Sequence, residues 1–185
     1  MQKGRVILSK DQFQLTITRL CHQLIENYPS FDDCCIVGIQ DRGAILSDRI
    51  MKTMKKIMPK SDIDYGKLDI TFYRDDFRRR DTPLKASSTH MDFIIEDKNV
   101  ILVDDVLYTG RTIQAALTAL QQFGRPAKVE LLSLVDRRFN RALPIQSNYV
   151  GVTVDSIDEA YVKVEWKQID GEDQILLFSQ SEDPK

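Results

Sequence analysis

The sequence predicts an α/β fold with a mostly parallel central sheet and helices on both of its faces. Residues 34–39 form a continuous apolar run of strand length, and the largely apolar residues 100–103 and 129–135 also predict strands buried on both faces. Segments with apolar side chains at helical spacing lie between these runs. Strands that alternate with helices are typical of a parallel sheet, and ligands of such sheets bind at the carboxyl ends of the strands.

Length and composition favour one globular domain over residues 1–185. A chain of 185 residues can bury one substantial core but is short for two. Hydrophobic residues make up 42% and charged residues 29%, which is ordinary for a globular protein. The formal net charge of −2 excludes a global field that attracts nucleic acid, so any nucleic-acid role needs a local basic patch.

The expected location is the cytoplasm. No apolar run approaches the roughly 18 residues of a membrane helix, so we expect no membrane partner, and the first residues do not resemble a signal-peptide core. The three cysteines, Cys21, Cys34 and Cys35, lack the spacing of metal ligands. We therefore expect reduced thiols in the core, as in cytosolic proteins.

The first part of the chain predicts a short strand and an amphipathic helix. Residues 5–8 have strand character. Ser9 supplies an N-cap and Gln12, three positions later, completes a capping box, while Pro29 ends the helix. The buried side of this helix is a stripe at helical spacing, formed by Phe13, Ile17, Leu20, Cys21, Leu24, Ile25 and Tyr28.

The middle of the chain predicts a second helix and a flap. A polar turn at residues 40–43 follows the first buried strand, and a helix is expected from about residue 44 to residue 57. Alternation at residues 68–73 predicts a strand. Residues 74–92 are highly charged and have no core pattern, and so long an irregular segment in a compact domain is usually a functional flap or disordered.

The C-terminal part predicts a helix and a β-hairpin. Residues 112–123 form a helical pattern that Gly124 and Pro126 close. Apolar alternation, an Asp-Gly turn and an apolar return over residues 162–178 predict the hairpin. Trp166 is expected to pack inside it and not to serve as a stacking platform.

The most informative segment is residues 100–112, in which a buried strand leads into two acids and then a helix start. The helix N-terminus offers unpaired N–H groups and a positive dipole end to a phosphate, and Gly110 allows close approach. Asp104 and Asp105 would repel phosphate, so they suit vicinal sugar hydroxyls or a hydrated magnesium ion. A ribose phosphate satisfies both demands.

This segment resembles the 5-phosphoribosyl-1-pyrophosphate (PRPP) motif of type I phosphoribosyltransferases, and it has neither the Walker pattern nor a dinucleotide fingerprint. The resemblance implies the type I fold, with a small hood and a C-terminal β-hairpin. It implies that Asp104 and Asp105 hold the ribose hydroxyls and contact Mg²⁺ mainly through substrate or water. The residues implied to bind PRPP or the product UMP are Asp104, Asp105, Val106, Leu107, Tyr108, Thr109, Gly110, Arg111 and Thr112.

Along most of the chain the resemblance narrows to the PyrR family, the pyrimidine-regulatory uracil phosphoribosyltransferases. Residues 37–43, 68–76 and 134–145 resemble the family's pyrophosphate loop, its hood and its base-side region. The implied reaction joins uracil to PRPP and releases pyrophosphate, with Asp104, Asp105 and Arg42 as catalytic residues. The other implied contacts are Asp41, Arg42 and Gly43 for pyrophosphate, Arg74, Asp75 and Asp76 in the flap, and Val135, Asp136 and Arg137 on the base side.

Two enzymatic or sensory alternatives stay open. Hypoxanthine-guanine phosphoribosyltransferases place an acid immediately before the Thr-Gly of the loop, where this sequence has Tyr108. Because uracil N1 is itself acidic and a general base contributes only about two to four orders of magnitude, Tyr108 favours uracil. A non-catalytic PRPP or UMP sensor could lose its pyrophosphate loop and flap, and both are present here, although Asp41 is an awkward neighbour for pyrophosphate.

An RNA-binding function is the third alternative, because PyrR relatives also bind the leader RNA of pyrimidine operons. The relatives carry basic residues at the positions of Asn27 and Val152, so this function stays a hypothesis. Relatives form dimers and tetramers, which implies a homodimer or homotetramer. The candidate RNA contacts are Thr18, Arg19, His22, Arg138 and Arg141.

Overall fold

A computed structural model describes residues 4–74, 87–155 and 161–178. The strands are β1 (Arg5–Leu8), β2 (Cys34–Ile39), β3 (Asp64–Leu68), β4 (Asn99–Leu107), β5 (Lys128–Arg138), β6 (Tyr149–Asp155), β7 (Tyr161–Glu165) and β8 (Gln174–Phe178). The helices are α1 (Lys10–Asn27), α2 (Arg42–Ile57), α3 (Arg111–Leu120) and the short α4 (Lys167–Asp170), with 3₁₀ turns at Thr71–Tyr73 and Gln121–Phe123. No helix in these ranges is long and apolar enough to cross a membrane.

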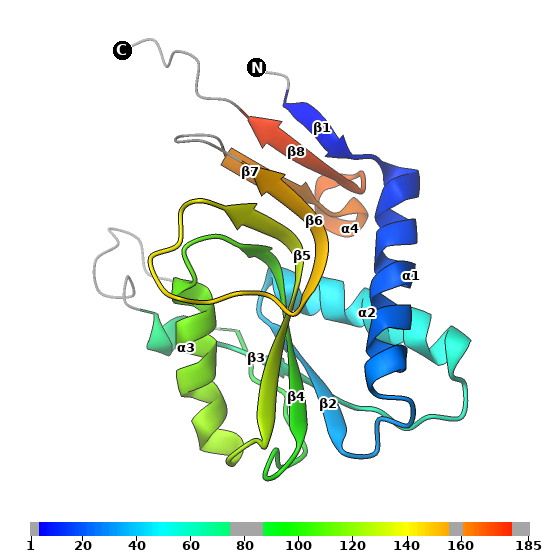
Figure 1. The fold of residues 1–185 in the computed structure, drawn as a ribbon, viewed down its shortest axis with the longest axis vertical. Helices are drawn as coiled ribbons and strands as arrows, with labels where there is room; N and C mark the ends of the chain where they lie inside the picture. The colour runs from blue at the N-terminus through cyan, green and yellow to red at the C-terminus, as the bar shows by residue number, and fades with distance from the viewer. Residues whose placement is uncertain (1–3, 75–86, 156–160, 179–185) are drawn as a thin grey trace.

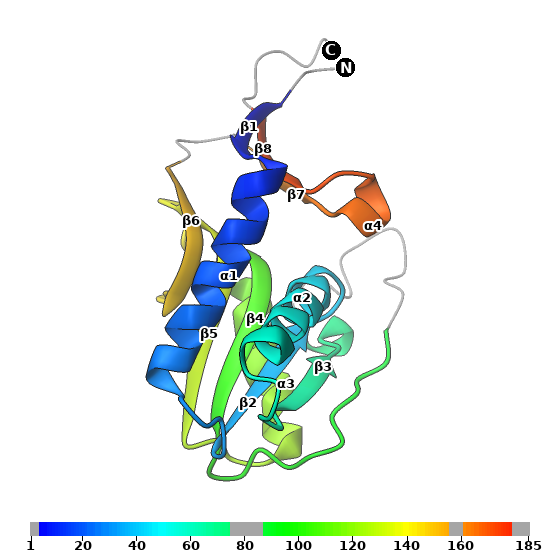
Figure 2. The same ribbon diagram turned by 90° about the vertical axis from the view of Figure 1, so that its right-hand side faces the viewer.

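A five-stranded parallel sheet in the order β3-β2-β4-β5-β6 forms the body of the molecule (Figure 1). Successive residues of β4 alternate between its two faces, so Ile101 and Val103 pack with α1 and α2, whereas Val100 and Leu102 pack with α3. Figure 1 shows α3 on one side of the sheet and α1 and α2 on the other, and in Figure 2 α1 and α2 lie in front of the sheet. The predicted fold class is therefore confirmed.

The first helix begins and ends where the sequence predicts. Ser9 and Gln12 form the capping box, and the hydroxyl and backbone N–H of Ser9 both donate to the Gln12 side chain. α1 ends at Asn27, two residues before Pro29. Cys21, like Cys34 and Cys35 in β2, is a buried free thiol, and burial raises the pKa of each to about 12. The prediction of core cysteines is confirmed for burial.

The strand predicted at residues 68–73 is wrong. Pairing of β3 with β2 ends at Leu68, because Asp69 then turns the chain. The Asp69 carboxylate accepts hydrogen bonds from the backbone N–H (2.9 Å) and the hydroxyl (2.5 Å) of Thr71, a local bond that competes with strand pairing. Residues 71–73 form a 3₁₀ turn instead. Strand β6, beyond the predicted elements, completes the sheet edge.

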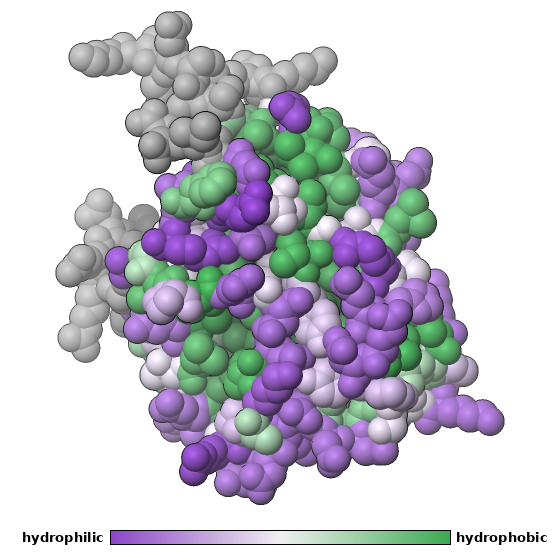
Figure 3. Space-filling view, in the orientation of Figure 1, coloured by the Kyte–Doolittle hydropathy of each residue, from purple (hydrophilic) through white to green (hydrophobic). Residues whose placement is uncertain are grey.

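A three-stranded antiparallel sheet, β1-β8-β7, lies at one end of the body. We call this sheet, with α4, the hood from here on; residues 68–74 are not part of it. It contains the predicted C-terminal hairpin, whose turn is filled by α4. Trp166 is fully buried and its ring meets Phe13 of α1 edge-on at 5.2 Å, so its predicted packing role is confirmed. Apolar side chains gather on the outer surface over β1 and β8 (Figure 3), where Val6 is 51% exposed.

Candidate active site

The carboxyl ends of β2, β4 and β5 meet at the end of the body that faces the hood (Figure 1). A cleft of about 550 Å³ opens there. Its lining from the body is Arg42, Arg74, Asp105, Val106, Tyr108, Thr112 and Arg137, and its lining from β7 is Tyr161, Val162, Lys163 and Val164. The strand ends thus bring the three predicted segments together, and the hood adds a wall that the sequence did not indicate.

The two acids lie on the last part of β4 with few donors from the protein around them. Asp104 is 6% exposed and accepts the backbone N–H of Asp105 at 3.0 Å. Burial, and then the charge of Asp105, raise the pKa of Asp104 well above its ordinary value. Burial raises the pKa of Asp105 to about 6, against the opposing charge of Arg42. Carboxylates in this state gain strongly from donors that a ligand brings.

The turn after β2 packs directly against these acids. A Cβ at Gly43 would lie 2.5 Å from the carbonyl oxygen of Val103 and 3.2 Å from Oδ1 of Asp104, so only glycine fits. The Gln40–Asp41 peptide is cis. The Asp41 carboxylate accepts the Ser87 hydroxyl at 2.7 Å, so the acid is held by a neighbouring loop.

The loop after β4 has the geometry of an anion site. Gly110 is the N-cap of α3 with φ of +90°, a conformation that favours glycine, and Ile145 would lie 3.2 Å from any added Cβ. The carbonyl of Thr109 accepts the backbone N–H groups of Ala142 (3.0 Å) and Leu143 (3.2 Å), which fixes the loop. The first N–H groups of α3 therefore point from a fixed position toward the cleft end of the sheet.

The base-side segment lies against this loop. Val135, Asp136 and Arg137 are all buried at the end of β5. The Arg137 guanidinium stacks on the Tyr108 ring, 3.9 Å from its centroid. One wall of the cleft is thus an arginine–tyrosine pair.

Arg141 is an internal tie in the site. Its guanidinium donates to the carbonyls of Leu107 and Tyr108, to those of Arg137 and Ile145, and to the Asp136 carboxylate. The side chain is half-buried. These bonds hold the loop after β4 beside the end of β5, and the predicted role of Arg141 as an RNA contact stays a prediction.

The other candidate RNA contacts lie on α1 and at the β5–β6 edge. Thr18 is half-buried and donates to the carbonyl of Gln14, and His22 is exposed. Arg19 donates to the carbonyls of Val150 (3.2 Å) and Gly151 (2.5 Å) in β6.

The polar and charged side chains at this edge also have partners within the chain. Arg138 forms a two-bond ion pair with Asp155 at 2.6 and 2.7 Å. Asn27 donates to the hydroxyl of Tyr149 at 2.9 Å. Arg19 and Arg138 are therefore exposed cations that already hold backbone or carboxylate oxygens.

The flap is only partly described. Arg74 lines the cleft, and its charge opposes the rise in the pKa of Asp104 that burial and Asp105 cause. Asp75 and Asp76 lie outside the described residues, as does the arginine run at 78–80.

The donor set suits a hydrated cation. Within the described ranges there is no group of three or more His, Cys, Asp or Glu side chains that could enclose a metal ion. Two adjacent carboxylates fit Mg²⁺, which keeps several waters and is commonly shared with substrate phosphates.

Comparisons with known proteins agree with this geometry. The phosphoribosyl transferase domain pattern matches residues 6–169. The bifunctional protein PyrR of Elusimicrobium minutum (strain Pei191) is 40% identical over 179 residues, which cover 97% of this chain and 99% of that protein. The bifunctional protein PyrR of Bacillus cereus (strain AH820) is 38% identical over 182 residues, which cover 96% of this chain and 99% of that protein.

Solved structures show the same fold. A hypoxanthine phosphoribosyltransferase from Staphylococcus aureus has a TM-score of 0.68 at 21% identity, covering 93% of this chain and 90% of that chain. The enzyme of the same name from Trypanosoma cruzi has a TM-score of 0.67 at 13% identity, covering 94% and 95%. These solved structures show the fold alone, because they are only 21% and 13% identical to this chain. The identity of about 40% to PyrR proteins over nearly the whole chain shows that the chain belongs to the PyrR family of type I phosphoribosyltransferases.

Proposed function

We propose that this protein transfers the phosphoribosyl group of PRPP to uracil, forming UMP and pyrophosphate. The observation that carries the proposal is one cleft that combines two adjacent carboxylates, buried Asp104 and half-buried Asp105, with the N-terminus of α3. Both carboxylates have few donors from the protein, and Gly110 leaves the start of the helix open. Asp104 and Asp105 need hydroxyl donors, and the start of α3 needs an anion. A ribose 5-phosphate supplies both groups with the right polarity.

Each part of the site has a role in the transfer. The start of α3, with Thr109 and Thr112, holds the 5′-phosphate, and Asp104 with Asp105 orients the ribose hydroxyls. The turn at residues 41–43 and the Arg42 guanidinium hold the pyrophosphate. Mg²⁺, bound through substrate and water beside the two acids, would neutralise the charge that develops on the departing pyrophosphate.

The bonding change is a displacement at ribose C1. The bond from C1 to the pyrophosphate oxygen breaks, a bond from C1 to uracil N1 forms, and the N1 proton passes to solvent. Catalysis then rests on positioning and charge stabilisation by the protein. Arg74 and the flap residues Asp75 and Asp76 are proposed to exclude water from the reactive sugar.

Tyr108 supports uracil as the base. It stands where purine transferases have an acid, and its ring is covered by Arg137. The base-side acid Asp136 is ion-paired with Arg141, so it is occupied and poorly suited to receive a purine proton. A base with an acidic N1 needs neither group as a proton acceptor.

A base panel tests the proposal. Purified protein is incubated with PRPP and Mg²⁺, and uracil, hypoxanthine, guanine and orotate are offered separately while nucleotide formation is measured. We expect turnover with uracil alone, and none from the Asp104→Asn plus Asp105→Asn variant. Purine turnover would show that Tyr108 does not select the base. PRPP or UMP binding without turnover of any base would support the sensor function instead.

A second function is favoured by the family and by α1. We propose that the homo-oligomer also binds a pyrimidine leader RNA, using the exposed flank of α1 that carries Thr18, Arg19 and His22. Because Arg19 and Arg138 already hold internal oxygens and Asn27 is neutral, we expect weak, salt-sensitive binding. Gel shifts with candidate leader RNAs at low salt test this, with sedimentation to measure the dimer or tetramer. An unshifted RNA at low salt would contradict the RNA function.

A further inference from the structure

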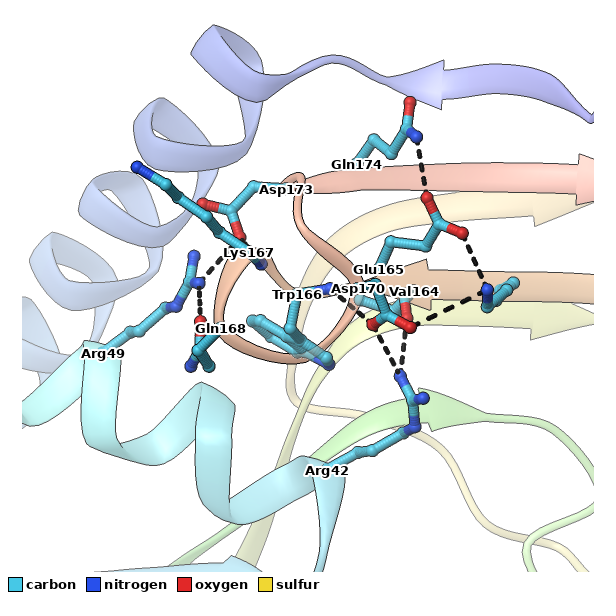
Figure 4. Close-up of polar contacts among 11 residues, drawn as sticks. Arg42, Arg49, Val164, Glu165, Trp166, Lys167, Gln168, Asp170, Asp173 and Gln174 are labelled. Carbon is cyan, nitrogen blue, oxygen red and sulfur yellow. Dashed lines mark hydrogen bonds and ion pairs between the residues drawn. The ribbon is translucent and has the colours of Figure 1, made fainter.

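Helix α2 reaches the hood through two arginines, one at its first residue and one two turns later (Figure 4). Arg49 donates to the carboxylate of Asp173 at 2.7 Å, and its guanidinium lies 5.0 Å from the Trp166 ring centroid. Arg42 donates from Nη1 to the carbonyl of Val164 at 2.7 Å, and the same nitrogen lies 3.7 Å from the Asp170 carboxylate. Each arginine is therefore matched to one hood carboxylate.

The two arginines differ in what else they face. The Arg49 side chain is 19% exposed and sits among hood and α1 residues, with the Phe13 ring also within 5.6 Å. The Arg42 side chain is 40% exposed and lines the cleft. Within the described residues, the hydrogen bond of Arg42 to Val164 and its ion pair with Asp170 both use Nη1, which leaves Nη2 and Nε for a ligand. Arg49 anchors the hood, whereas Arg42 remains open to a ligand.

Asp170 is itself held rigidly. Its Oδ2 accepts the backbone N–H of Trp166 at 2.9 Å, across the turn of α4. Its Oδ1 faces the Lys163 ammonium at 3.8 Å, and the side chain is only 15% exposed. The carboxylate thus has a fixed position that does not depend on Arg42.

We propose that Asp170 is a positioning residue, which with the Val164 carbonyl holds Arg42 in the orientation that receives the pyrophosphate of PRPP. The proposal deepens the proposed function and rests on it. A free arginine loses side-chain freedom when it binds an anion. An arginine that the hood already holds on one side loses less side-chain freedom on binding. The other nitrogens of its guanidinium group can still donate to a phosphate.

The arrangement also links the hood to the pyrophosphate turn. β7 supplies Val164, α4 supplies Asp170, and α2 begins at Arg42 directly after the turn. When the hood is packed on the body, the Arg42 guanidinium is held in the orientation that binds the pyrophosphate. The hood therefore contributes to PRPP affinity from residues that do not touch the substrate.

A matched pair of variants tests the proposal. Asp170→Asn keeps an oxygen for the Trp166 N–H and removes the charge beside Arg42. Asp173→Asn keeps an oxygen for the Lys167 N–H, which Asp173 accepts at 2.8 Å, and removes the charge beside Arg49. Both changes weaken one hood-to-α2 pair, but only the first pair borders the cleft.

We expect Asp170→Asn to raise the Kd for PRPP and for pyrophosphate about 5- to 20-fold, with PRPP KM rising in step and kcat within about twofold. Asp173→Asn should leave both Kd values within about twofold while lowering the melting temperature. Fluorescence of Trp166, the single tryptophan, reports in both variants whether the hood stays packed on α1. Binding is measured by calorimetry, so the identity of the base does not affect the result.

A double-mutant cycle separates positioning from simple structural loss. In an Arg42→Ala background, Asp170→Asn should change the Kd for PRPP by less than about twofold, because its effect passes through Arg42. Equal PRPP affinity in Asp170→Asn and wild type would overturn the positioning role. So would equal losses in Asp170→Asn and Asp173→Asn, or an additive cycle. Failure of the wild type to bind PRPP at all would overturn the proposed function and this inference with it.

Discussion

Two buried acidic sites on neighbouring strands are built in opposite ways. Near the start of β5, Glu130 accepts the hydroxyls of Tyr28 and Tyr149 at 2.8 Å each and pairs with Lys128. Burial alone would raise the pKa of Glu130, but these partners hold it below its ordinary value. Toward the end of β4, Asp104 and Asp105 have raised pKa values.

This difference in pKa shift and in hydrogen-bond donors distinguishes Glu130, a structural acid, from Asp104 and Asp105, which we propose to be functional. The protein supplies Glu130 with donors of its own, among them the hydroxyl of Tyr149. Burial, and then the hydrogen bond to Glu130, raise the pKa of Tyr149 to about 12. The protein supplies Asp104 and Asp105 with few donors, so the folding free energy carries an uncompensated cost there. Perturbed acids in a cleft are typical of functional sites, and burial, the largest cause here, acts on acids that the protein supplies with few donors.

Removing the under-donated acids should have the largest effect. We expect Asp104→Asn plus Asp105→Asn to weaken PRPP binding at least about 100-fold, since two charge-assisted bonds of roughly 1.5–3 kcal/mol each are lost. The same variant should be more stable than wild type at about pH 8, on the order of 2 kcal/mol from Asp105 alone. Calorimetry and urea unfolding measure both, and a less stable variant would break the comparison.

The Glu130 site should respond with the opposite sign. Glu130→Gln leaves the two tyrosines and Lys128 without their charged acceptor, so we expect a loss of about 1–3 kcal/mol in the free energy of unfolding. PRPP affinity should stay within about twofold, because Glu130 lies outside the cleft. Loss of PRPP binding without loss of stability would contradict the structural assignment.

Acidification should sharpen the contrast. The folded pKa of Asp105, about 6, lies above its unfolded value, so its contribution to stability is full below about pH 4 and is lost as pH rises through 6. The stability gain of the double asparagine variant should therefore shrink between pH 8 and pH 4.

Glu130 has the reverse sign, because its folded pKa is lowered. Its contribution is present above the ordinary glutamate pKa and is lost as pH falls through the folded value. PRPP affinity should fall about tenfold at pH 5 relative to pH 8, since only about a tenth of Asp105 is ionised one unit below its pKa. A flat affinity profile would exclude Asp105 as the titrating ribose ligand.

Asp136 is the intermediate case, an acid that precedes the cleft-lining Arg137 and has an internal partner in Arg141. Arg141→Lys removes the planar fork that spans four carbonyls and this acid. We expect PRPP KM to rise about three- to tenfold through a loosened phosphate loop. Arg138→Lys, at an exposed pair, should change it by less than twofold. Unchanged kinetics with loss of RNA binding in Arg141→Lys would contradict this role in the loop and support Arg141 as an RNA contact.

Local patterns in the sequence predicted the parts of the site that are local in the structure. Residues 100–112 contain a strand, two acids and a helix start in one continuous segment, so their arrangement was predictable. The hood wall at residues 161–164 was missed because it reaches the cleft only through long-range packing. Asp170 was visible only as a turn residue.

The errors have the same origin. The internal bonds of Arg141 were missed because its partners are mostly backbone carbonyls, which a sequence does not display. The wrong strand at residues 68–73 was predicted from a real alternation of apolar and polar residues. The hydrogen bonds from Thr71 to the Asp69 carboxylate turn the chain there and end the strand. Contacts between distant elements, and single side-chain bonds that turn the chain, are what a pattern of residues leaves out.

The hood is completed by pairing of β1 with β8, the first and the last strands in the described chain. During synthesis on the ribosome, β1 emerges early and has no β8 to pair with until all strands of the parallel sheet have been synthesised. A nascent chain that halts before β8 can fold its phosphate loop, yet it has an open strand edge and an unfinished hood around Trp166. We therefore expect a chain that ends before β8 to be prone to aggregate and to lack the ordered hood wall of the cleft.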